Sequence, residues 1–251
     1  MSFWNVVNKV ITHSDIVVEV LDARFVDESR NAEIERKIEL KGKLLLHVIN
    51  KCDLVDKNYL DKKKKTLQHC VFVSSTEHHG FTKLREKIII LGKKHLKLDK
   101  VIVGVVGYPN TGKSSVINAL SGKHKAGTSS RSGFTKGVQH IKADNRIRLL
   151  DTPGVIPFKE GDELKLALLG STNFDDIKDP EFIAYHLIEK NKLLIEQCYG
   201  IPADDPDKFF ESLALKLHYM GKGGVADTIR AARQVLLDWQ KGKPWNTYNK
   251  K

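Results

Sequence analysis

The stretch Gly107-Tyr-Pro-Asn-Thr-Gly112-Lys113-Ser114 decides the fold that we expect for this chain of 251 residues. It has the form G-x-x-x-x-G-K-[ST], it follows the apolar run Val101–Val106, and it opens a helical pattern. Such a loop wraps a phosphate chain, because glycines let successive backbone N–H groups point inward at a helix N-terminus. A chance match occurs at roughly the one-per-cent level in a chain of this length. A plain glycine-rich turn is therefore the weaker interpretation.

This loop predicts a first set of site residues. Lys113 is expected to reach the β- and γ-phosphates of a nucleotide, and the Ser114 hydroxyl is expected to bind Mg²⁺. Further nucleotide contacts are predicted at Asn110, Thr111, Gly112 and Ser115.

A second motif, Asn50-Lys51-Cys52-Asp53, follows the apolar run Leu44–Ile49 and predicts which base is bound. A carboxylate only accepts hydrogen bonds, and guanine presents two adjacent donors where adenine presents an acceptor. Asp53 is thus expected to select guanine. Lys51 is expected to lie along the base plane, and Asn50 to tie this loop to the phosphate loop.

A companion loop is expected after the apolar run that begins at Val71. Ser74, Ser75 and Thr76 follow this run, and Gly80 comes shortly after them. A backbone N–H near Ser75 is expected to donate to O6 of guanine, with Ser74 and Ser75 both at the nucleotide.

Two further segments have the character of nucleotide-dependent switches. Asp151-Thr-Pro-Gly154 predicts a carboxylate that holds Mg²⁺ through water and a Gly154 N–H that faces the γ-phosphate. The polar loop 122–137 is long enough to be functional, and Thr135 is its candidate for binding Mg²⁺ in the GTP state. Competing candidates in the same loop are Thr128, Ser129, Ser130 and Ser132.

The order of these motifs is unusual, because the guanine motif and its companion loop precede the phosphate loop. A cyclic shift leaves the site intact if the original termini lie close together. The chain resembles the circularly permuted P-loop GTPases, and most nearly the YlqF/RbgA family of ribosome-assembly GTPases. The resemblance also includes Asp22-Ala23-Arg24, Asp151-Thr-Pro-Gly-Val155 and Asp162-Glu-Leu164.

The residues expected to take part in catalysis are Lys113, Thr135 and Gly154. Many GTPases place a glutamine after D-x-x-G to orient water, but Val155 stands there, so intrinsic hydrolysis is expected to be slow. The resemblance implies a K⁺ ion that is held partly by Asn110. An equal alternative is that Asn110 only forms the loop, because asparagine tolerates a left-handed φ. The Pro-Gly-His segment of bacterial members is missing, and His13 does not match it.

The pattern of apolar runs predicts an α/β fold: a three-layer P-loop domain with a mostly parallel sheet, at residues 1–157, and a small all-α domain at 158–251. The expected strands are 16–21, 44–49, 71–74, 101–106, 139–143 and 147–150. The expected helices are 31–40, 57–68, 81–97, 112–121, 181–198, 208–220 and 225–241. The short turn at Asp144-Asn145 predicts one antiparallel edge.

The charge of the chain predicts a polyanionic partner. The formal net charge is +11, and residues 1–158 hold 28 Lys and Arg against 16 Asp and Glu, a formal +12. A C-terminal stretch suited to RNA is formed by Lys222, Arg230, Arg233, Lys241 and Lys243, with nearby aromatics. For the tryptophans of this stretch we favour packing in the helical core over contact with RNA.

Composition narrows the remaining classes. Three scattered cysteines among 251 residues fit reduced thiols better than a disulfide framework, and no run is long enough to span a bilayer. We therefore expect a protein of the cytoplasm, and we expect it to be a monomer. The motifs predict that it uses GTP/GDP and Mg²⁺. The resemblance implies K⁺ as a further cofactor, and the large ribosomal subunit and its rRNA as the partner. The alternatives are a GTPase of another RNA process, such as tRNA maturation, and an RNA-binding scaffold with negligible hydrolysis.

Overall fold

The computed structural model describes residues 3–122, 139–143, 145–151, 163–170 and 177–248, and it divides into two compact units. The first unit is Met1–Lys159 and the second is Glu160–Lys251. We describe each unit by itself. Predicted site residues Thr135 and Gly154 lie outside the described residues, as do Thr128, Ser129, Ser130 and Ser132.

The first unit is built on a six-stranded sheet with the order β3-β2-β1-β4-β6-β5. The strands are β1 (Ile16–Asp22), β2 (Leu44–Asn50), β3 (Cys70–Phe72), β4 (Val101–Val106), β5 (Gln139–Lys142) and β6 (Ile147–Asp151). All neighbouring pairs are parallel except β5 with β6, which are antiparallel. The α/β fold and the antiparallel edge predicted from the sequence are both confirmed.

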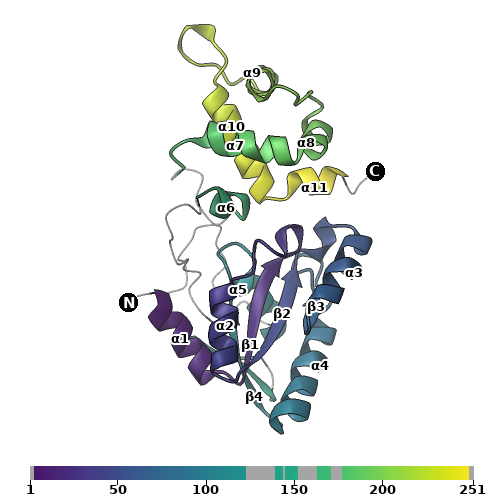
Figure 1. The fold of residues 1–251 in the computed structure, drawn as a ribbon. Helices are drawn as coiled ribbons and strands as arrows, with labels where there is room; N and C mark the ends of the chain where they lie inside the picture. Colours follow the sequence, from purple (N-terminus) through teal and green to yellow (C-terminus); the bar gives the residue numbers. More distant parts are fainter. Residues whose placement is uncertain (1–2, 123–138, 144, 152–162, 171–176, 249–251) are drawn as a thin grey trace. The chain divides into compact units, whose positions relative to one another are not determined.

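Helices cover both faces of this sheet (Figure 1). They are α1 (Phe3–His13), α2 (Ala32–Leu40), α3 (Lys57–Thr66), α4 (Phe81–Leu91) and α5 (Lys113–Ser121). One apolar cluster joins α1 and α2 to one face of the sheet, and a second joins α4 and α5 to the other face. Because both faces are covered, every residue of β1 is buried, and the strand is apolar except at Glu19 and Asp22.

Helix α1 approaches the sheet unusually closely at Gly104 of β4. A Cβ atom at this position would lie 2.2 Å from Ser14 Oγ and 2.6 Å from Val10 Cγ1. The Ser14 hydroxyl donates to the Val10 carbonyl oxygen at 2.5 Å, which fixes it against its own helix. Only glycine therefore fits under the end of α1.

The second unit contains only helices among its described residues. They are α6 (Glu163–Leu168), α7 (Pro180–Lys190), α8 (Lys192–Tyr199), α9 (Pro206–Lys216), α10 (Thr228–Gln240) and α11 (Lys243–Tyr248). Asp205 caps α9 by accepting from two backbone N–H groups, and Pro206 occupies the first turn, where its missing N–H costs nothing. No helix in the described part of the chain is long and apolar enough to cross a membrane.

The core of the second unit lies around α10. Trp239 is 1% exposed, packs 4.1 Å from the ring of Trp245, and donates its Nε1–H to the Leu168 carbonyl oxygen at 2.9 Å. Tyr199 donates to the Asp238 carboxylate at 3.0 Å, and Lys243 holds the same carboxylate at 2.6 Å. Core packing is thus the correct interpretation of Trp239.

Two details of the helical prediction were wrong. The single helix expected over 181–198 is interrupted at Asn191, whose backbone leaves the helical region and whose side chain donates to the Leu187 carbonyl oxygen. Asparagine competes with the helix ladder in this way. The helix expected over 225–241 begins only at Thr228, after its N-cap Asp227. Pro244, which follows this helix, lies in the first turn of α11, where proline is tolerated. Helices α1, α6 and α11 were not predicted.

The contact at Gly104 yields a stability prediction. Gly104→Ala should lower the free energy of unfolding by about 1–3 kcal/mol, because the added methyl group overpacks the α1 interface. Guanidinium denaturation of the wild type and of Gly104→Ala measures this difference in the free energy of unfolding. Ser14→Ala removes the nearest obstacle, so the double variant should recover part of the loss. A neutral Gly104→Ala would contradict the described contact.

Candidate functional site

Three loops meet at the carboxyl ends of the central parallel strands, and Asn50 joins them. Its Nδ2 donates to the Thr111 carbonyl oxygen of the phosphate loop at 2.9 Å. Its Oδ1 accepts from the Ser75 backbone N–H at 3.2 Å and from the Ser75 hydroxyl at 2.9 Å. The expectation that Asn50 ties its loop to the phosphate loop is confirmed. The N–H of Ser75 is itself engaged by Asn50.

The phosphate loop has the backbone of an anion cradle. Gly107, Asn110 and Gly112 all have positive φ, at 139°, 60° and 95°. A Cβ atom on Gly112 would lie 2.2 Å from Asn50 Nδ2, so a side chain there would disrupt the joint between the loops. Because Asn110 is in the left-handed region, its backbone conformation alone accounts for an asparagine at this position. The K⁺ role of Asn110 stays a prediction.

Side chains of the phosphate loop are held against its own backbone. Lys113 Nζ donates to the Tyr108 carbonyl oxygen at 2.7 Å, and Thr111 Oγ1 donates to the same oxygen at 2.9 Å. Ser114 and Ser115 follow Lys113 in the first turn of α5, whose N-cap is Gly112. Backbone N–H groups at this end of α5 point where an anion would be stabilised.

Asp53 lies in the short 3₁₀ turn Cys52–Leu54 that follows β2. Its Oδ1 atom is buried and has no hydrogen-bond partner among the described residues. A buried carboxylate oxygen without a donor is costly, so this atom needs a ligand that donates hydrogen bonds. The two adjacent N–H groups of guanine meet that need.

Lys51 is placed between the base loop and the phosphate loop. It has a left-handed backbone with φ 63°, and its Nζ donates to Asp22 Oδ2 at 2.7 Å and to the Asn110 carbonyl oxygen at 2.8 Å. Burial lowers the pKa of Lys51, and the charge of Asp22 opposes this shift.

Asp22 and Arg24 were not predicted as site residues. Asp22 ends β1, and its carboxylate accepts from Arg24 Nε at 2.9 Å and from Arg24 Nη2 at 2.7 Å. Burial alone would raise the pKa of Asp22, but Arg24 and Lys51 outweigh it and hold that pKa well below its usual range. The only signal in the sequence was Asp-Ala-Arg after an apolar run, and this pattern does not predict which cations bind the Asp22 carboxylate.

The remaining predicted residues differ in how far the structure places them. Ser74 is buried, exchanges backbone hydrogen bonds with His79, and accepts from the Glu77 N–H through its hydroxyl at 3.1 Å. Asp151 is the last residue of β6, two strands from β1. The side chain of Asp151 is not among those that the structure describes, so its contact with Mg²⁺ stays a prediction.

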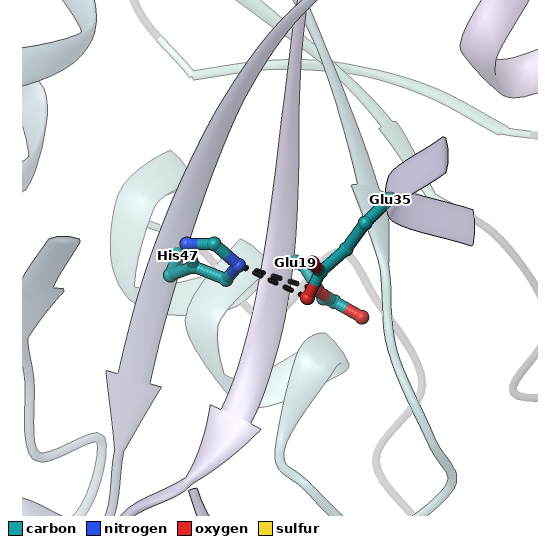
Figure 2. A group of neighbouring side chains, drawn as sticks. All are labelled: Glu19, Glu35 and His47. Carbon is teal, nitrogen blue, oxygen red and sulfur yellow. Dashed lines mark hydrogen bonds and ion pairs between the residues drawn. The ribbon is translucent and has the colours of Figure 1, made fainter. Parts of the chain in front are cut away.

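A second polar cluster, Glu19, Glu35 and His47, lies between β1, β2 and α2 (Figure 2). His47 Nε2 is 3.5 Å from Glu19 Oε2 and 3.4 Å from Glu35 Oε1. Three potential metal ligands therefore converge, with their donor atoms within 4.8 Å of one another. Neither Glu19 Oε2 nor His47 Nδ1 has a hydrogen-bond partner in the described part of the chain.

Charge favours a proton over a metal ion in this cluster. Arg30 already binds both oxygens of Glu35, at 2.7 Å each, so that carboxylate is neutralised. With both carboxylates ionised, Arg30 and a protonated His47 bring the formal charge to zero, whereas a divalent cation beside neutral His47 would leave an excess positive charge. Burial would lower the pKa of His47, but the nearby carboxylates of Glu19 and Glu35 outweigh it and raise that pKa to about 9.

Residues 102–200 match the family model described as 50S ribosome-binding GTPase. An uncharacterised GTP-binding protein of Methanocaldococcus jannaschii is 37% identical over 244 residues, which are 95% of this chain and 65% of that protein. Nucleolar GTP-binding protein 2 of Saccharomyces cerevisiae is 34% identical and is matched over 96% of this chain and 52% of its own length.

The chain is also similar to solved structures of GTP-binding proteins of this kind, in two nucleotide states. YlqF from T. maritima in its GNP-bound form superposes with a TM-score of 0.67 at 26% identity, over 94% of this chain and 92% of that one. The GDP-bound form of YlqF gives a TM-score of 0.69 at 27% identity, over 94% of each chain.

The fold, the joined loops and the motif order define a circularly permuted P-loop GTPase. Within that class, the chain is similar to YlqF over 94% of its length. It spans about two thirds of the length of the archaeal relative and about half that of the yeast relative.

The His47 cluster generates a prediction for stability against pH. The folded pKa of about 9 lies above the ordinary value of 6.5, so the protonated ring stabilises the folded state fully below about pH 6.5. This contribution should be lost as pH rises from 6.5 to 9, by roughly 2–3 kcal/mol. Denaturant unfolding across this range measures it.

His47→Gln should flatten the pH dependence over this window, whereas His13→Gln, at an exposed position, should leave it as in the wild type. An unchanged slope in His47→Gln would contradict a protonated ring between the two carboxylates. Binding of one zinc ion per chain at neutral pH would contradict the preference for a proton.

Proposed function

We propose that this protein binds and hydrolyses GTP and acts as an assembly factor for the large ribosomal subunit. The observation that carries the nucleotide part is the buried Asp53 Oδ1 atom, for which the described residues offer no hydrogen-bond partner, in the loop that Asn50 joins to the phosphate loop. An acceptor-only carboxylate meets both N–H donors of guanine and is repelled by the N1 acceptor of adenine. The site therefore favours guanine nucleotides.

The proposed roles at the phosphates follow from the positions of the loop residues. Lys113 is released from the Tyr108 carbonyl oxygen to bind the β- and γ-phosphates, and Ser114 in the first turn of α5 binds Mg²⁺. When bound, Mg²⁺ would neutralise part of the negative charge of the phosphates. Asp151, Thr135 and Gly154 complete the proposed switch set, and Asn110 is the proposed K⁺ ligand.

Hydrolysis is proposed to be slow in the isolated protein. Val155 and Ile156 follow Gly154, and neither side chain orients water by a hydrogen bond. A partner, or a K⁺ ion near Asn110, is then needed to stabilise the charge that develops in the transition state.

The ribosomal part rests on the relatives and on charge. The matched family is described as ribosome-binding, and the excess of positive charge favours RNA. In the second unit Lys222 and Arg230 are exposed, and the Arg230 guanidinium lies 4.1 Å from the ring centroid of Tyr219. The proposal includes that the protein acts on ribosomal particles as a monomer in the cytoplasm.

Base selection is tested by nucleotide affinity. The wild type should bind GTP about 10⁴-fold more tightly than ATP. Asp53→Ala should abolish most of this preference, and Asp53→Asn, which offers an N–H₂ donor, should favour xanthosine triphosphate, whose C2 bears a carbonyl. Titration calorimetry measures each affinity. Asp61→Asn on exposed α3 is the control. Equal affinity of the wild type for ATP and GTP would overturn the guanine site.

The ribosomal role is tested by sedimentation with purified large subunits. Binding should be stronger with a GTP analogue than with GDP, and should weaken steeply between two salt concentrations because phosphates are neutralised. Large subunits should also accelerate hydrolysis. The double variant Lys222→Glu/Arg230→Glu should reduce binding, whereas Lys208→Glu, which removes a lysine paired with Asp205, should not.

The outcomes separate the competing functions. Stimulation by small RNA alone would support another RNA process, such as tRNA maturation. Nucleotide-dependent binding without hydrolysis under any condition would support a scaffold, for which the apolar Val155 is the motivating observation.

A further inference from the structure

We propose that Asp22 is a positioning residue of the nucleotide site, which holds Lys51 in place between the guanine loop and the phosphate loop. This inference rests on the proposed binding of GTP. It gives a function to the Asp-Ala-Arg segment, which none of the roles assigned so far includes.

Asp22 occupies a central position in the fold. It is the last residue of β1, which lies between β2 and β4, and it is in register with Asn50 at the end of β2. The guanine motif continues from β2, and the phosphate loop continues from β4. A side chain at the end of β1 therefore reaches both loops, and the carboxylate of Asp22 is 1% exposed there.

Its contact with Lys51 carries the proposal. Lys51 Nζ lies 2.7 Å from Asp22 Oδ2 and 2.8 Å from the Asn110 carbonyl oxygen, so one ammonium group joins two loops that are 59 residues apart. A free lysine side chain has about 2 kcal/mol of rotamer entropy, which favours leaving this position. The carboxylate opposes that tendency, because an ion pair shielded from water is stronger than one at the surface.

Arg24 fixes the direction in which the carboxylate points. Its side chain binds both oxygens of Asp22, and its backbone N–H donates to Oδ1 at 3.1 Å. The Asp22 N–H donates to the Ser29 hydroxyl at 3.1 Å, which holds the following turn. Oδ2 is thus presented to Lys51 without freedom to rotate. Two cations share one anion, so the group keeps a formal charge of +1, which suits a nucleotide.

The alternative is that Asp22 only pairs with Arg24 and stabilises the turn after β1. Both interpretations predict that Asp22→Asn lowers stability. They differ in whether the effect on nucleotide affinity passes through the Lys51 ammonium group, and a double-mutant cycle measures that difference.

The experiment measures GDP affinity for the wild type, Asp22→Asn, Lys51→Met and the double variant of the full chain. Methionine keeps an apolar stem and removes the ammonium group. Asp22→Asn should weaken GDP binding by about tenfold or more in the wild type, and by less than about threefold when Lys51 is methionine. Equal losses in both backgrounds would overturn the proposal. Asp27→Asn, which removes an exposed ion pair with Lys63, should change affinity by less than about twofold.

A second pair of variants covers failure of Asp22→Asn to fold, since it leaves Arg24 buried without its partner. Arg24→Met removes that cation, so Lys51 becomes the remaining ion-pair partner described for Asp22. Adding Asp22→Asn to Arg24→Met should still weaken GDP binding about tenfold, and unchanged affinity would contradict the proposal. If the wild type does not prefer guanine nucleotides, the proposed function fails. If the wild type prefers guanine nucleotides but Asp22→Asn binds GDP with full affinity, only this inference fails.

Discussion

The site depends on the geometry of a parallel sheet, in which adjacent strands end at the same edge. Strands β1, β2 and β4 end there side by side, and Asn50 then joins the loops that follow β2 and β4 through hydrogen bonds to Thr111 and Ser75. None of these contacts depends on which strand comes first in the chain. A permuted order of motifs is therefore compatible with an intact nucleotide site, because the loops keep their neighbours when the connections change.

The sequence predicted the parts of this arrangement that local pattern determines. Runs such as Val101–Val106 predict strands buried on both faces, and Gly112-Lys113-Ser114 predicts the start of α5. The sequence did not predict Asp22 and Arg24 as site residues, because the partner of a buried charge is set by tertiary packing. Helix α1 was missed although its buried residues Val6, Val7, Val10 and Ile11 recur at helical spacing. Asn191 breaks a helix whose apolar spacing continues through it.

Buried charges near the site are arranged in groups rather than in isolated pairs. Asp22 is shared by Arg24 and Lys51, and His47 lies between two glutamates of which one is held by Arg30. A charge removed from water is tolerated only with compensating partners. Glu19 and Asp22 lie on β1 and His47 lies on β2, so the strands that support the guanine loop also carry buried charged side chains from both groups.

The edges of the sheet have a consequence for how the molecule meets its neighbours. Strand β3 at one edge is only three residues long, and its neighbouring helix α3 carries a run of lysines. An exposed row of unpaired backbone groups invites another chain to add a strand, and short length and nearby positive charge both discourage this. The lysine run of α3 is therefore expected to oppose edge-to-edge association of this sheet at high concentration.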